Sequence, residues 1–322
     1  MIRFIQNHIS LSVQAGLALL GAVLLWSSSF IALKVAVSAF DPMVMVFGRM
    51  LSSLIGLSVL RLTVWRNAPP ILLNRSVTRR EWKFVILLAL CEPCFYFVFE
   101  GYAMTYTTAS QAGMVVSALP LAVVLAAWLL LGERPHRRVW IGFVLAVVGV
   151  VWLSAGSVAT ESAPDPVFGN MLEALAMLCS ALYVICAKQL SSRCTPVLIT
   201  TVQSLAGLCF FLCLLFLPAV KLPDAFPLLP TLAVLYLGVG VTMISFLLYN
   251  FAIRSVPASR TAAFLNLVPV LTLFMGMVFL EERLTAGQWV ASALVIGGVV
   301  LSQWKTAQAD QAAAAEGAEG SE

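Results

Sequence analysis

Long apolar runs alternate with short polar segments along this chain. A transmembrane helix needs about 20 mostly apolar residues, and continuous runs without alternation indicate helices and not the strands of a barrel. The runs lie at about residues 14–33, 43–60, 84–104, 110–131, 139–155, 169–187, 196–217, 228–249, 261–280 and 286–304. The pattern predicts an all-α polytopic membrane protein with ten transmembrane helices.

Composition supports a membrane protein and distinguishes the last residues of the chain from the apolar part. Hydrophobic residues make up 61% of the 322 residues and charged residues only 11%, against about 25% charged in a soluble domain. The first run is longer than the 7–15 residue core of a signal peptide, so we expect a span and not a removed leader. Residues 305–322 are acidic and of low complexity, which predicts a disordered tail.

The chain repeats itself after about half its length. EGYAMTYTTASQAGMVVSALPLAVVLAAWLLLGER begins at Glu100 and YNFAIRSVPASRTAAFLNLVPVLTLFMGMVFLEER begins at Tyr249, an offset of 149. The matched positions include Pro120 with Pro269, Glu133-Arg134 with Glu282-Arg283, and Trp140 with Trp289. This duplication predicts two five-helix units, 1–155 and 156–304, and an odd number of spans in each unit makes the second unit inverted.

Positive charges predict the orientation of the spans. With the N-terminus in the cytoplasm, 15 of the 19 Lys and Arg residues fall in cytoplasmic segments and 3 in outer loops. Because cytoplasmic loops carry an excess of Lys and Arg, we expect a multi-pass protein of the cell (inner) membrane with both termini in the cytoplasm. The net charge of +4 then reflects topology and does not indicate nucleic-acid binding.

The two copies share a recognisable pattern, yA…yttAsqAg…lPl…lllGER…W.G….GV, at Tyr102–Val151 and Phe251–Val300. It resembles the EamA-type repeat of the drug/metabolite transporter superfamily. The resemblance implies ten helices around a central cavity between inverted halves. It also implies transport of amino acids, other metabolites or drugs.

Three ionisable side chains fall inside apolar spans: Arg49, Glu92 and Glu100. Each costs roughly 2.5–3.5 kcal/mol at the bilayer centre unless it meets a partner, water or a cavity. Glu92, Tyr96 and Glu100 follow at intervals of four and therefore lie on neighbouring parts of one helix surface. One interpretation is a structural ion pair with Arg49. The other is a proton or substrate site, because two acids against one Arg leave one carboxylate without a cation.

Two prolines stand at matched positions in the fourth and ninth spans. Each frees the carbonyl four residues earlier, which neighbouring side chains can fill or which can line a cavity. Asn266 lies beside the second proline, and Tyr249 is the repeat counterpart of Glu100. The candidate substrate- or proton-binding residues are Arg49, Glu92, Tyr96, Glu100, Tyr249, Asn266 and Trp26, and Pro120 and Pro269 are the candidate hinges and cavity wall.

Other motifs favour structural roles. The Glu133-Arg134 and Glu282-Arg283 pairs predict interfacial ion pairs and helix ends. Small residues on two spans (Gly142, Ala146 and Gly149; Ala291, Gly297 and Gly298) predict close helix packing, with dimerisation as the alternative. Cys91 and Cys94 lie inside an apolar helix without a nearby His, so we expect no metal site.

These features predict a secondary transporter that exports small polar or amphipathic metabolites such as amino acids. We expect it to work by alternating access and to be driven by a proton gradient or by exchange. The alternatives are a multidrug or organic cation efflux transporter and a membrane scaffold. We find no paired nucleophile and base, no metal ligands and no nucleotide loop, so we expect neither an enzyme nor a cofactor. The expected partners are a small-molecule substrate, lipid and protons, with a monomer or weak homodimer as the assembly.

Overall fold

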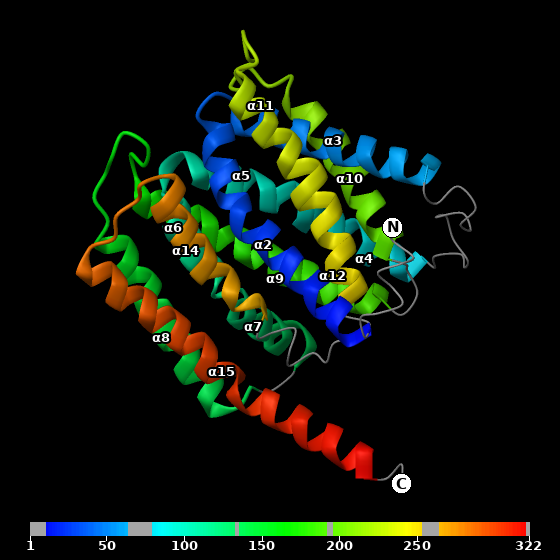
Figure 1. Ribbon diagram of the computed structural model, residues 1–322, viewed down its shortest axis with the longest axis vertical. Helices are drawn as coiled ribbons and strands as arrows, with labels where there is room; N and C mark the ends of the chain where they lie inside the picture. Colours follow the sequence, from blue (N-terminus) through cyan, green and yellow to red (C-terminus); the bar gives the residue numbers. More distant parts are fainter. Residues whose placement is uncertain (1–10, 64–78, 133–134, 192–195, 253–263, 320–322) are drawn as a thin grey trace.

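The described part of the protein is helical throughout and forms one bundle (Figure 1). The computed structural model describes residues 11–63, 79–132, 135–191, 196–252 and 264–319, and these residues form no β-strand. Seven of their helical stretches are long and apolar enough to cross a membrane. Three shorter apolar helices, Leu198–Leu214, Leu267–Phe279 and Ala286–Ser302, accompany them.

The helices follow in this order: α2 (Leu11–Val37), α3 (Pro42–Thr63), α4 (Arg79–Ala89), the π-helical η1 (Leu90–Phe95), α5 (Tyr96–Tyr106), α6 (Ala109–Val116), α7 (Leu119–Leu131), α8 (Arg137–Ala155), α9 (Pro166–Ser191), α10 (Pro196–Leu214), α11 (Leu228–Leu235), the π-helical η2 (Tyr236–Ile244), α12 (Ser245–Ala252), α14 (Leu267–Phe279) and α15 (Ala286–Glu319).

Prolines explain where several of these helices start and break. Proline has no N–H to donate and is tolerated in the first turn of a helix. Pro120 accordingly stands in the first turn of α7, after a turn that separates α7 from α6. Pro269 stands in the first turn of α14. Pro93 follows Glu92, whose φ of −144° and ψ of 116° interrupt the run from α4 to α5.

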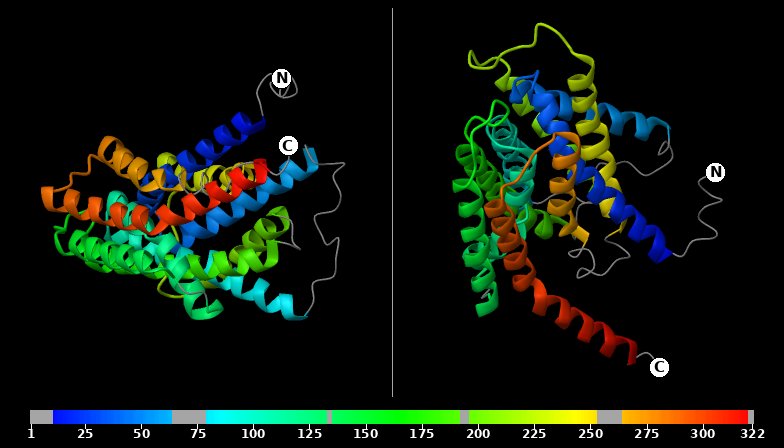
Figure 2. Two further views of the ribbon diagram at one scale, coloured as in Figure 1. Left: turned by 90° about the horizontal axis from the view of Figure 1, so that it is seen from below. Right: turned by 60° about the vertical axis from the view of Figure 1, so that its left-hand side comes forward.

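Helices α8 and α15 lie side by side at one edge of the bundle (Figure 2). Their contact depends on glycine, because a Cβ at Gly298 would lie 2.5 Å from the carbonyl oxygen of Gly142. Gly149 likewise packs against Val295 and the carbonyl of Ala291. The predicted close packing is therefore confirmed for Gly142, Gly149 and Gly298, which join α8 to α15 within one chain, whereas a Cβ at Gly297 would meet nothing within 4 Å.

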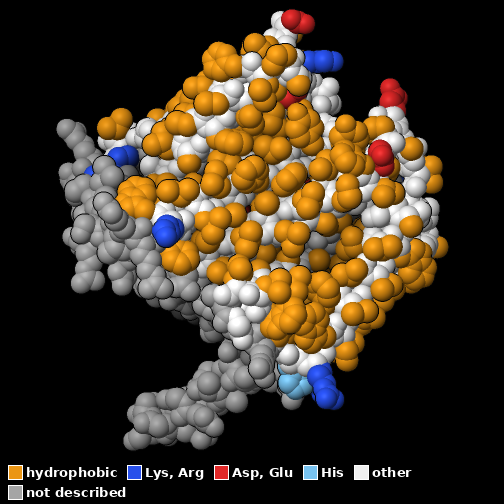
Figure 3. Space-filling view, turned by 180° about the vertical axis from the view of Figure 1, so that it is seen from behind, with side chains coloured by type: hydrophobic (Ala, Val, Ile, Leu, Met, Phe, Trp, Pro, Cys, Tyr) orange, Lys and Arg blue, Asp and Glu red, His pale blue; other side chains and the backbone are white. Residues whose placement is uncertain are grey.

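A cluster of buried apolar side chains from α2, α3, α5, α10, α11 and η2 forms the main core. The outer surface is also apolar: Leu62 is 73% exposed, Phe274 57% and Val144 58%. Figure 3 shows this on one face, where hydrophobic side chains cover most of the surface between charged groups near its edges. A soluble monomer rarely exposes so large an apolar surface, so this surface faces lipid.

The start of α2 and the end of α15 lie toward the same end of the bundle (Figures 1 and 2). Helix α15 continues to Glu319, so the prediction of a disordered tail from residue 305 differs from the structure. The segment is rich in Ala, Gln and Glu, which are strong helix formers.

Candidate functional site

Arg49 of α3 is buried and has three partners. Its Nε donates to Thr242 Oγ1 at 2.8 Å, and its Nη1 donates to Glu100 Oε2 at 3.3 Å. Its guanidinium carbon lies 4.1 Å from the centre of the Phe97 ring. Thr242 can reach it because η2 packs closely on α3: a Cβ at Gly238 would lie 2.5 Å from the Arg49 carbonyl oxygen. A charge-assisted bond, an ion pair and a ring face therefore offset the cost of burying this cation.

Glu100 joins Arg49 to the next turn of α5. Its Oε1 accepts a hydrogen bond from the Tyr96 hydroxyl at 2.8 Å, and its side chain is only 5% exposed. The spacing of four residues places Tyr96 and Glu100 on one helix face, as the sequence predicts. The ion pair that one interpretation expects is therefore present, and both oxygens of this carboxylate have partners.

Glu92 is bonded in a different way, through its side chain and its backbone. The Ser180 hydroxyl of α9 donates to Glu92 Oε2 at 3.2 Å, and Gln203 Nε2 of α10 donates to the Glu92 carbonyl oxygen at 3.1 Å. Because the Glu92 backbone is not helical and the Tyr96 N–H bonds to the Cys91 and Pro93 carbonyls instead, the Glu92 carbonyl is available to a side chain from another helix. Among the described residues, Arg49 is paired with Glu100 and not with Glu92.

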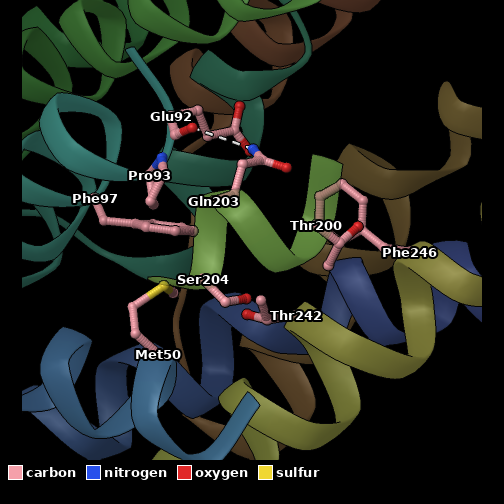
Figure 4. Close-up of a pocket in the computed structure, with 9 residues that line it drawn as sticks. All are labelled: Met50, Glu92, Pro93, Phe97, Thr200, Gln203, Ser204, Thr242 and Phe246. Carbon is pink, nitrogen blue, oxygen red and sulfur yellow. Dashed lines mark hydrogen bonds between the residues drawn. The ribbon is translucent and has the colours of Figure 1, made fainter. Parts of the chain in front are cut away.

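A small pocket lies between these groups (Figure 4). Its cavity is about 20 Å³, which has room for about one water molecule. It draws its walls from both sequence halves: Met50, Glu92, Pro93, Phe97, Thr200, Gln203, Ser204, Thr242 and Phe246. In Figure 4, Gln203 and Glu92 meet on one side and Ser204 and Thr242 approach each other on another.

The other sequence candidates lie outside this lining. Trp26 packs against Tyr249 with ring centres 5.2 Å apart and against Phe246 at 5.7 Å. Trp26 therefore adjoins the pocket through Phe246, and Tyr249 packs on the Trp26 ring. Asn266 directly precedes α14. The structure brings Arg49, Tyr96 and Glu100 into direct contact, places Glu92 in the pocket wall, and places Asn266, Pro120 and Pro269 elsewhere.

Polar contacts close the bundle at the end where α5 stops and α6 begins. The Glu282 carboxylate, from the segment between α14 and α15, accepts from the backbone N–H groups of Ala109 and Ser110, both at 2.8 Å. The ion pair predicted for Glu282-Arg283 is thus replaced by a cap on the N-terminus of a helix in the other half. Its repeat counterpart, Glu133-Arg134, lies outside the described residues. Lys34 acts on the adjacent helix end, where its Nζ donates to the carbonyl oxygens of Met104, Thr107 and Ser162.

A network of side-chain hydrogen bonds, mostly buried, links further helices at the same end of the bundle. The Thr107 hydroxyl donates to Asn170 Oδ1 at 2.7 Å, and Asn170 Nδ2 donates to Gln111 Oε1 at 2.8 Å. Ser157 donates to the same Gln111 oxygen at 2.8 Å, and Gln288 Nε2 donates to Ser157 Oγ at 3.3 Å. These bonds connect α5, α6, α9 and α15, so the two sequence halves are held together at this end.

Several residues of the site were not found by sequence reasoning. Thr242, Gln203, Ser180 and Phe97 become partners only through the packing of distant helices. Glu173 of α9 is fully buried, and its position inside the apolar run 169–187 is the signal that could have identified it. Within the described ranges, no group of three or more His, Cys, Asp or Glu side chains could hold a metal ion.

Comparisons with known proteins show the family of this chain. The EamA-like transporter family matches residues 14–155 and again 167–304. "Uncharacterized transporter YetK" of Bacillus subtilis (strain 168) is 31% identical over 244 residues, which cover 75% of this chain and 74% of that protein. "Probable terminal-alkyne amino-acid exporter" of Streptantibioticus cattleyicolor is 27% identical over 296 residues, 90% of this chain and 93% of that protein.

A solved structure described as "Crystal structure of protein" has a similar fold. It superimposes with a TM-score of 0.58 and 21% identity, and the match covers 90% of this chain and 96% of that one. At this identity the likeness concerns the fold alone.

Proposed function

Because this chain belongs to the EamA-like transporter family, we propose that it exports small polar or amphipathic metabolites, such as amino acids, by alternating access. One observation carries the proposal: a buried Arg49, with Glu100 and Tyr96, stands beside a pocket that both halves line. Charges inside a membrane are expensive and mark substrate or ion pathways. The relative named as an amino-acid exporter supports the substrate class.

The proposed architecture is ten transmembrane helices in two inverted five-helix repeats. Two family matches, 14–155 and 167–304, support repeat boundaries near residue 155 and residue 304. The seven long and three shorter apolar helices support the number of spans. Both termini are placed in the cytoplasm, with the Glu282 end of the bundle outside. The bias of Lys and Arg and the common end of α2 and α15 support this orientation.

In the proposed cycle, the substrate carboxylate replaces Glu100 on Arg49. An Arg guanidinium matches a carboxylate with two parallel hydrogen bonds, and Thr242 already holds the Nε side of Arg49 in place. The present pocket is too small for a metabolite, so loading requires that the halves separate at one end. The helix breaks at Pro120 and Pro269 are the proposed hinges, and the Glu282 contacts are the closed outer end.

Organic cation efflux is the second candidate. It is favoured by the charge balance of the buried groups. Three acids, Glu92, Glu100 and Glu173, are buried inside the bundle, and Arg49 is the counter-charge among the buried described residues. A site with surplus carboxylates suits an ammonium group. The two candidates differ in what Arg49 does: it binds substrate in the first and only positions Glu100 in the second.

A ligand screen on detergent-purified protein tests the proposal. Amino acids, nucleosides, sugars and cationic drugs are compared by their effect on the apparent Tm, because a ligand that binds only the folded state stabilises it by about 2.7 kcal/mol at 100 times its Kd. We expect an amino acid to stabilise the wild type and Arg61→Gln, a variant at the far end of α3, but not Arg49→Gln.

The same compound must then move across the membrane of proteoliposomes. Stabilisation by cationic drugs alone, retained in Arg49→Gln, would select the second candidate. Absence of both stabilisation and flux for every class would instead favour a scaffold.

A further inference from the structure

Glu173 is a buried acid that the site described above does not use. Its side chain on α9 is 0% exposed, and neither carboxylate oxygen has a hydrogen-bond partner among the described residues. Placing an isolated ionised carboxylate in an apolar interior is far more costly than neutralising it. The group is therefore either protonated here or in need of a cation that binds beside it.

The packing of α9 places Glu173 at the level of Glu100. Near its start, Gly169 lies against Ala103 of α5 and against Thr107, the residue directly after α5. Further along α9, Ser180 bonds to Glu92. The two helices thus run antiparallel, and Glu173, one turn after Gly169, lies beside the turn of α5 that carries Glu100. Figure 1 shows α5 and α9 as neighbours in the centre of the bundle.

The charged surroundings of Glu173 are acidic. Glu100 is close enough to act on it electrostatically, and Glu173 in turn acts on the Tyr96 hydroxyl group. Helices α6 and α7, which also pack against α9, carry no ionisable side chain. Glu92 in η1 lies two turns away, beside Ser180.

The described ionisable side chains on the neighbouring helices do not neutralise it. Lys83 of α4 and Arg137 and Arg138 of α8 are exposed near the ends of their helices. Cys91 and Cys94 of η1 are free thiols and supply no positive charge. The buried cation Arg49 is already paired with Glu100. A proton is thus the simplest counter-charge for Glu173.

We propose that Glu173 is the proton-binding residue of this transporter and that it exchanges its proton for the ammonium group of the substrate. The proton leaves the carboxylic acid for water, and the resulting carboxylate pairs with the ammonium group. Because one carboxylate serves both cations, proton and substrate bind alternately, which couples their movements in opposite directions. The inference rests on the proposed transport function and names the residue that couples it to protons.

The protonated state can be measured without any substrate. Infrared spectroscopy of the purified protein at neutral pH reports the carbonyl stretch of protonated carboxylic acids. We expect a band in the wild type that shrinks by one acid in Glu173→Gln and is unchanged in Glu161→Gln, an exposed acid just before α9. A band of equal area in all three proteins would overturn the proposal.

Folding does not confound this measurement, because Gln has nearly the shape of the neutral acid. We expect Glu173→Gln to keep the apparent Tm of the wild type, whereas loss of a structural carboxylate would lower it. Glu173→Asp provides a second variant: it retains an acid, so its band should persist at a shifted frequency. Complete loss of the band in Glu173→Asp would contradict the assignment.

Coupling is tested in proteoliposomes with a labelled compound found in the ligand screen. Glu173→Gln should lose accumulation driven by a pH gradient and should also bind the labelled compound more weakly, because it lacks the carboxylate that pairs with the ammonium group. Glu161→Gln should keep both accumulation and binding. Retained pH-driven accumulation would overturn the inference and leave the proposed function intact. Absence of flux in the wild type would overturn the proposed function, while the infrared result would still decide whether Glu173 holds a proton.

Discussion

Replacing Glu282 by glutamine should loosen the end of the bundle where α6 begins. The first three backbone N–H groups of α6 all have acceptors: Glu282 takes those of Ala109 and Ser110 at 2.8 Å, and Thr108 Oγ1 takes that of Gln111 at 3.2 Å. Glutamine has a single oxygen, and its NH₂ group would face an N–H donor. At least one bond and the full negative charge at the helix N-terminus are therefore lost.

The size of the effect follows from these contacts. A hydrogen bond to a charged group contributes about 1.5–3 kcal/mol, and loss of an N-terminal cap costs about 0.5–2 kcal/mol. Glu282 is half-buried, so water recovers part of the loss and we expect a net cost of about 1–2 kcal/mol. That energy corresponds to a roughly 5–30-fold increase in the opening of this end.

Hydrogen exchange followed by mass spectrometry measures the exchange rates of the affected backbone amides. Peptides that contain residues 107–116 should exchange roughly 5–30-fold faster in Glu282→Gln than in the wild type. The matched control is Glu281→Gln, one residue earlier on the exposed side of the same turn. Equal exchange in the two variants would show that the Glu282 cap does not hold this end closed, and the reasoning would fail.

Two further variants test the packing and the ion pair. Gly298→Ala should lower the apparent stability by about 1–3 kcal/mol, because the new Cβ would meet the Gly142 carbonyl at 2.5 Å. Gly297→Ala, which meets nothing within 4 Å, should gain about 0.5–1 kcal/mol from helix propensity, and equal Tm values would refute this account. Arg49→Gln should cost about 3–5 kcal/mol by leaving Glu100 buried without its cation. Adding Glu100→Gln should restore most of that loss in a thermal unfolding assay, and additive losses would argue against a coupled pair.

Hydropathy alone was sufficient to locate most helices but not their continuity. The run 84–104 is in fact three pieces, α4, η1 and α5, because the backbone at Glu92 leaves the helical region before Pro93. The predicted span 261–280 overlaps α14 from Leu267 onward, and its first residues lie outside the described ranges. Apolar length sets where a chain can cross a membrane, whereas local backbone bonding sets where the helix breaks. A hydropathy pattern predicts where the chain can cross a membrane but not where a helix breaks.

The chemistry of the site depends on how separate helices are placed against one another. The spacing of residues within one helix does not give this placement. Intervals of four put Tyr96 and Glu100 on one face, and the structure agrees. The Thr242 partner of Arg49 is 193 positions away and depends on the close contact at Gly238.

The role of Glu173 also depends on the placement of neighbouring helices, because here no partner from the described ranges reaches the side chain. Its residue type and apolar surroundings are visible in the sequence, yet its significance arises from what surrounds it in three dimensions. Had a cation from another helix reached its oxygens, Glu173 would be half of a structural ion pair, as Glu100 is. The absence of any partner among the described residues changes its expected chemistry from holding helices together to binding a mobile cation. Charge counts along a chain cannot separate these two cases, because they depend on where neighbouring helices place their few polar groups.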